Sequence, residues 1–180
     1  MRKDLIESYI RQLRNSFGLK RPIGDEKLYA LHQAKDYHGM VGVIMTALAI
    51  DFKVKLGLVN SGGPNAPAWI EKPAQFPPFF SPKFKEVEVT MYLRKTFLAE
   101  VGFETVVVAI SHELSHVVLD STASPLREHE EAVDLTAMLL GFRDFYVTGS
   151  IVKRKNEDYL LGYLSPEELS HAAWFMTYSQ

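Results

Sequence analysis

The longest stretch of apolar positions in the chain is residues 103–119, FETVVVAISHELSHVVL. Apolar side chains recur on every side of a helix drawn through it, and a helix that is hydrophobic all round is a buried one. The alternation of a half-exposed strand is absent. The segment therefore predicts a buried helix. Its few polar side chains need partners, because burying a polar group unpaired costs free energy.

A second helix is predicted over residues 125–142, PLREHEEAVDLTAMLLGF. Ser124 is a good N-cap, Pro125 suits the first helical position and Gly141 marks the end of a helix. The intervening residues 120–124, DSTAS, are a short polar turn. We therefore expect the two helices to form an antiparallel hairpin.

Alternating apolar and polar positions predict strands over residues 52–59 and 87–93. Between them lie the turn NSGGP at 60–64, a further strand within 65–70, and a proline-rich loop at 71–83. Three strands followed by two helices predict an α+β fold, with a small twisted sheet packed on helices.

Helical spacing of apolar residues predicts an amphipathic helix within residues 1–20 and another helix from Glu26 to about Ala49. A capping box with proline at the first helical position begins a final helix at Ser165. Residues 145–150 are interpreted as a short strand or loop. The whole chain, residues 1–180, is expected to form one domain.

Composition narrows the function classes. The net charge is −2 and no basic block is present, so nucleic acid is not an expected partner. The apolar run at residues 40–50 is too short to span a bilayer, which takes about 20 residues. The first twenty residues lack the apolar run of a secretory signal, and the absence of cysteine fits a reducing compartment. A cytoplasmic location is therefore expected.

Within the buried helix, His112, Glu113 and His116 form an HExxH pattern. Residues four apart share one helical face, so the two imidazoles can bind one Zn²⁺ ion. The glutamate beside them can act as the general base that activates water at the metal. A zinc ion also compensates two buried imidazoles directly; core histidines bonded to carbonyls are the alternative.

A zinc site of this kind needs a third protein ligand and one open position. Counting helical rise along both arms of the predicted hairpin places Glu130 opposite His116, and Asp134 opposite His112. Glu130 is thus the preferred third ligand, with His129 and Glu131 as its main competitors. Asp134 is the natural acceptor for the free N–H of His112. Other acidic residues nearby suit turn or helix-end roles better; they are Asp120 and Glu128.

HELSH followed by EEAVD resembles the gluzincin zinc peptidases, whose pattern is HExxH and then Glu-x-x-x-Asp on the next helix. The small single-domain minigluzincins are the most similar in layout, and the ImmA/IrrE group is a second possibility. The resemblance implies a zincin-like fold with an active-site helix and an antiparallel glutamate helix. It also implies an edge strand on the substrate side that pairs with a bound peptide. The residues that match this motif are Asn65, Ala66, Ala68 and Trp69; Pro67 departs from it, since proline removes one backbone donor.

Together these patterns predict a metallopeptidase with one zinc ion that hydrolyses a restricted peptide or protein substrate, with or without a regulatory protein partner. The alternative is a non-catalytic, zinc-stabilised domain that binds a partner through its cleft and edge strand. Gluzincins often add a side chain that stabilises the oxyanion. The candidates are Tyr146, Tyr159, Tyr163 and His171, and their spacing selects none of them.

Overall fold

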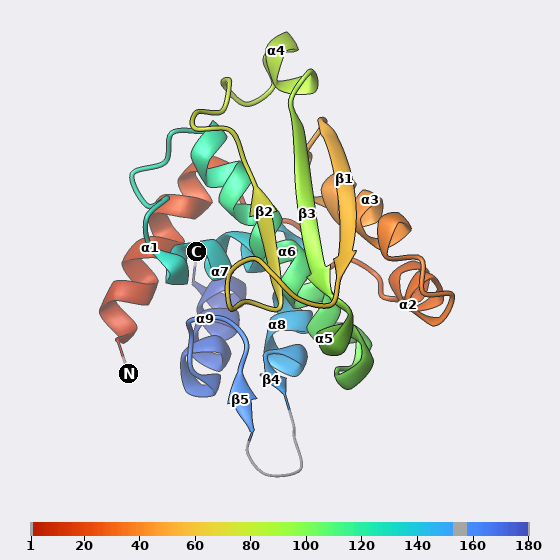
Figure 1. Cartoon of the computed structure of the whole chain (residues 1–180). Helices are drawn as coiled ribbons and strands as arrows, with labels where there is room; N and C mark the ends of the chain where they lie inside the picture. The colour runs from red at the N-terminus through yellow and green to blue at the C-terminus, as the bar shows by residue number, and fades with distance from the viewer. Residues whose placement is uncertain (1, 153–157, 180) are drawn as a thin grey trace.

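The structure is a computed structural model, and it describes residues 2–152 and 158–179 (Figure 1). It has a mixed α and β architecture, in which a small sheet packs on several helices. The elements are α1 (Lys3–Phe17), α2 (Glu26–Gln33), α3 (Tyr37–Ala47), β1 (Lys53–Val59), β2 (Ala68–Glu71), α4 (Pro82–Lys85), β3 (Glu88–Arg94), α5 (Lys95–Glu100), α6 (Phe103–Ser121), α7 (Glu130–Ala137), a π-helical turn (Met138–Phe142), α8 (Arg143–Gly149), β4 (Ile151–Val152), β5 (Tyr159–Leu160) and α9 (Pro166–Tyr178).

The main sheet has the strand order β1-β3-β2. β1 runs parallel to β3, and β2 runs antiparallel to it with Ala68 opposite Leu93. The alternation read from the sequence matches the burial of β3, whose Val89, Met91 and Leu93 are buried. The three predicted strands are confirmed, and β2 is an edge strand of this sheet.

Helix α6 forms the centre of the molecule. Fourteen of its nineteen residues are buried. The sheet lies on one side of it, and α7, α8, α9 and α1 gather on the other (Figure 1). The predicted buried helix is therefore confirmed. None of the described helices is both long and apolar enough to cross a membrane.

The second helix of the predicted hairpin begins later than its sequence signals suggest. Residues 125–128 form turns, His129 has extended backbone angles, and α7 begins at Glu130. The Ser124 hydroxyl accepts the N–H of Leu126 at 3.2 Å, so this residue caps a turn rather than a helix. Ser and Asp side chains stabilise turns by the same local bonds with which they cap helices, which makes the two hard to separate in sequence.

The predicted end of that helix is also corrected. The α-helical part of α7 stops at Ala137, the π-helical turn follows, and Gly141 within it has φ +111°. A Cβ at this glycine would lie 2.9 Å from the carbonyl oxygen of Arg21. The chain then continues directly into α8, so residues 145–149 are helical and not a strand or loop.

The helix predicted from Glu26 to Ala49 is two helices, α2 and α3. Lys35 takes φ +56° between them, and the Asp36 side chain caps α3 by accepting the N–H of Gly39 at 2.8 Å. The first helix and the final helix agree with their predictions. The capping box of Ser165 and Glu168 is present at the start of α9.

Candidate metal centre

Helix α6 presents His112 and His116 on one face, one turn apart. Their ring centroids are 5.0 Å apart and the rings are nearly perpendicular. Both side chains are largely buried, with exposed fractions of 13% and 20%. This is the arrangement that the four-residue spacing predicts.

Glu130, the first residue of α7, completes a group of three. Its Oε2 atom lies 3.4 Å from Nε2 of His112 and 3.3 Å from Nε2 of His116. Although it is this close to both rings, Oε2 is buried and makes no hydrogen bond to any described residue. One donor atom from each of the three residues lies within 4.8 Å of the others, so the group could hold a metal ion. A buried carboxylate oxygen this close to two imidazole nitrogens fits such an ion.

The competing ligands lie elsewhere. The Nδ1 atom of His129 is 3.1 Å from the hydroxyl of Tyr9, on the side of α1. Glu131 forms an ion pair with Arg2. Asp120 pairs with a lysine at position 72, and Glu128 with a neighbouring arginine. Of the candidates weighed from the sequence, only Glu130 joins the two histidines.

Asp134 lies one turn after Glu130 and is 1% exposed. Its Oδ1 atom is 2.8 Å from Nδ1 of His112, which leaves Nε2 of that ring free to face Glu130. A carboxylate in this position fixes both the tautomer and the orientation of a metal-ligating imidazole. The structure thus brings together all four residues proposed for the site from the two helical motifs.

The pKa values of the two histidines are shifted in opposite directions. Burial lowers the pKa of His112, but its contacts with Asp134 and Glu130 outweigh burial and raise the pKa to about 10. Burial and the neighbouring His112 charge lower the pKa of His116 to about 4. The contact with His112 lowers the pKa of Glu130. Metal ligands bind in their deprotonated forms, so a divalent cation at this group would take the place of the proton on His112.

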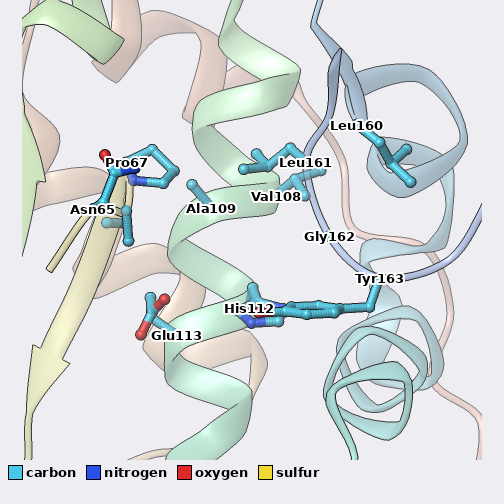
Figure 2. Close-up of a pocket in the computed structure, with 12 residues that line it drawn as sticks. Asn65, Pro67, Val108, Ala109, His112, Glu113, Leu160, Leu161, Gly162 and Tyr163 are labelled. Atoms are coloured by element: carbon cyan, nitrogen blue, oxygen red, sulfur yellow. The ribbon is translucent and has the colours of Figure 1, made fainter.

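Glu113 points from α6 toward the edge strand (Figure 2). The backbone N–H of Ile70 in β2 donates to its carboxylate, and burial raises its pKa to about 7. Because the Ile70 N–H points at α6, it cannot also bond to β3. The unpaired edge of β2 therefore faces the histidines.

A cavity of about 340 Å³ opens beside His112 and Glu113, between β2 and the segment 160–163. Asn65, Ala66 and Ala68, three of the four residues that match the edge-strand motif, line it. Trp69 does not, because its ring stacks on Tyr92 with centroids 5.0 Å apart. Neighbouring strand residues point to opposite faces of a sheet, which puts Trp69 on the far side.

Pro67 does not remove a donor from the free edge. Its carbonyl oxygen accepts the backbone N–H of Arg94 in β3 at 3.0 Å. The N–H and C=O of an extended residue point to the same side, so the missing donor would have faced β3.

Apart from Tyr163, which was one of four oxyanion candidates, the segment 160–163 was not identified by the sequence patterns. Leu160, Leu161, Gly162 and Tyr163 line the cavity wall opposite β2, and the Tyr163 ring stacks on His112 with centroids 5.8 Å apart (Figure 2). The signal in the sequence was a glycine within a short apolar run, YLLGYL, which by itself indicates only a turn.

Among the four oxyanion candidates, only Tyr163 lines this cavity. Tyr146 is fully buried. His171 is 3.2 Å from a carboxylate oxygen of Glu7 in α1. Tyr159 lines a neighbouring cavity together with Arg94.

Comparisons of the chain with protein-family models, with curated proteins and with solved structures found no match.

Proposed function

We propose that this protein is a zinc-dependent metallopeptidase that hydrolyses a restricted peptide or protein substrate. The observation that carries the proposal is the convergence of His112, His116 and Glu130 on one point, with Glu113 beside them. Two imidazoles and a carboxylate are a donor set found in catalytic zinc sites, which keep one position open. When bound, zinc would polarise a water molecule and the scissile carbonyl.

Glu113 supplies the proton transfers in this mechanism. Burial raises the pKa of its carboxyl to about 7, and a general base works best with a pKa near the operating pH. The Ile70 N–H keeps its carboxylate on the cleft side of α6. Glu113 takes a proton from the attacking water and later donates it to the leaving amine.

The cleft favours an extended peptide with an apolar side chain. The free edge of β2 supplies backbone donors and acceptors for β-strand addition. The neighbouring cavity is lined mainly by apolar side chains, among them Val108, Ala109 and Leu161. An apolar residue next to the scissile bond would fill it.

The test is Glu113→Gln in the full chain. We expect zinc affinity to stay within about threefold of the wild type, and cleavage of a proteome-derived peptide library to fall by about 10²–10⁴-fold. Glu104→Gln, on the first turn of the same helix, is the matched control and should leave both quantities unchanged.

Two results would contradict the proposal. Cleavage by Glu113→Gln at the wild-type rate would exclude Glu113 as the base. A wild-type protein that binds zinc and captures a peptide without cleaving it would support the non-catalytic partner-binding domain instead.

A further inference from the structure

Asp134 uses its two carboxylate oxygens for two different elements. Oδ1 contacts Nδ1 of His112 at 2.8 Å, and Oδ2 accepts the backbone N–H of Tyr163 at 2.7 Å. Because the side chain is 1% exposed, water cannot replace either bond without opening the structure. The carboxylate therefore joins a histidine of the metal group to the segment 160–163, which we call the cavity wall.

Gly162 allows this approach. It has φ +101°, and a Cβ built on it would lie 2.9 Å from Oδ2 of Asp134 and 3.3 Å from Oδ1. A side chain there would both strain the backbone and push the wall off the carboxylate. Gly162, which directly precedes Tyr163, is therefore favoured for two separate reasons: its positive φ and its short distance from Asp134.

Tyr163 contacts the metal group a second time through its ring. The ring lies 5.8 Å from that of His112, with 20° between the planes (Figure 2). On the outer side, a guanidinium nitrogen of Arg2 reaches the Tyr163 carbonyl oxygen at 3.5 Å. The wall is therefore held by Asp134 and His112, while Leu160 and Leu161 are among the residues that line the cavity.

We propose that Asp134 and Gly162 are positioning residues that set the cavity wall against the metal group. Occupation of the metal site then fixes the wall, and the wall in turn supports the histidine. The inference rests on the proposed function for its consequence in substrate binding, but the link between His112 and Tyr163 can be measured without any hydrolysis.

The physical reason is that a ligated imidazole can no longer swing away from Asp134. His112 fixed at Nε2 holds Oδ1 in place through Nδ1, and Oδ2 then stays aligned with the Tyr163 N–H. Coupling between two sites is reciprocal, so displacing the wall must weaken metal binding by the same factor.

The first experiment is amide hydrogen exchange on the wild-type chain, with and without zinc. We expect zinc to slow exchange of the Tyr163 amide by about tenfold. The Lys53 amide, which donates to the Val87 carbonyl oxygen at 3.0 Å and lies outside the cavity wall, is the internal control and should change far less. Zinc binding without a change at Tyr163, or with an equal change at both amides, would overturn the proposal.

The second experiment is Gly162→Ala, with Gly18→Ala as its control. Gly18 also has a positive φ, +73°, but a Cβ there meets nothing within 4 Å. Both variants should lose stability through backbone strain. Only Gly162→Ala should speed exchange of the Tyr163 amide and lower zinc affinity, each by about tenfold. Wild-type values for both in Gly162→Ala, or equal losses in Gly18→Ala, would contradict the coupling.

Failure of the proposed function would look different. If the protein binds zinc and shows the coupled exchange but cleaves no peptide, the positioning role stands and the peptidase proposal falls. If the wild-type protein cleaves peptides, but Gly162→Ala leaves both the protection of the Tyr163 amide and KM unchanged, the peptidase proposal stands and the positioning role falls.

Discussion

At the scale of single residues, Glu130 stands between two side chains that could also ligate a metal, and only its carboxylate turns toward the imidazoles. His129 contacts Tyr9, and Glu131 pairs with Arg2. Glu130 is the first residue of α7 and faces α6. Successive residues of a helix point in different directions, so its neighbours His129 and Glu131 face other parts of the molecule.

Glu130→Gln should therefore lower zinc affinity by at least about 100-fold, since an amide oxygen carries no charge with which to replace the carboxylate. Glu131→Gln, the neighbouring matched change, should stay near the wild type because it loses only a partly exposed pair with Arg2. Competition with a zinc-binding dye measures both. Full zinc affinity in Glu130→Gln would remove Glu130 from the ligand set.

The placement of Glu130 could be predicted from the sequence, although the reasoning assumed a helix that begins at Pro125. The structure replaces that first part with turns. What survives is the helical relation within the motif: once α7 begins at Glu130, Asp134 follows one turn later on the same face. The spacing of the motif therefore carries more information than the helix-capping signals before it.

At the scale of elements, the candidate site is a cleft between one helix, one edge strand and one short hairpin end. The distribution of apolar residues predicted α6, and the resemblance of residues 65–69 to an edge-strand motif predicted β2. The cavity wall has no such pattern. The strands before it, β4 and β5, are two residues each, and its bond to Asp134 comes from 29 residues earlier in the chain. The need for glycine at position 162 comes from its contact with Asp134, and no pattern in the residues around Gly162 indicates that contact.

The cleft gives a prediction for substrate preference. Ala109 lines the cavity three residues before His112 and is 4% exposed. Ala109→Leu would fill part of the cavity while keeping a good helix former in α6. We expect kcat/KM to fall about tenfold for peptides with a large apolar residue beside the scissile bond, and less for peptides with alanine there.

Zinc affinity is the control for this variant and should stay unchanged, because the Ala109 methyl group forms no hydrogen bond and Ala109 is not one of the three metal-site residues. Equal losses for large and small residues would mean that this cavity does not receive the substrate side chain.

At the scale of the whole molecule, the metal group joins three separate segments of the chain. Ligands come from α6 and α7, and the cavity wall precedes α9. A ligand that binds only the folded state stabilises it, by about 2.7 kcal/mol at a free concentration of 100 times Kd. We expect zinc to raise the midpoint of thermal unfolding by about 5–10 °C in a domain of this size.

The same titration in Glu130→Gln tests whether this stabilisation comes from the proposed site. The shift should shrink to near zero there. A full shift in that variant would place the stabilising zinc elsewhere on the protein.

The N-terminus is joined to the site region by Arg2, which pairs with Glu131 and Glu168. Glu168 is 5% exposed and also accepts the backbone N–H of Ser165 at 3.1 Å. Its bonds to Arg2 lower the pKa of the Glu168 carboxyl from 4.5 to about 2. A lowered carboxyl pKa stabilises the folded state above the ordinary value, and this stabilisation is lost as the pH falls from about 4.5 toward 2.

Glu168→Gln should consequently reduce the free energy of unfolding by about 2 kcal/mol at pH 7, the scale of a buried charge-assisted bond. The difference from the wild type should shrink steadily below pH 4.5 and nearly vanish near pH 2, because both chains then carry an uncharged side chain. Urea unfolding across this range measures it. The exposed neighbour Glu167→Gln is the control and should change little. A difference that stays constant with pH would mean that Glu168 acts through its shape and helix cap, and that its charge does not hold Arg2 against α9.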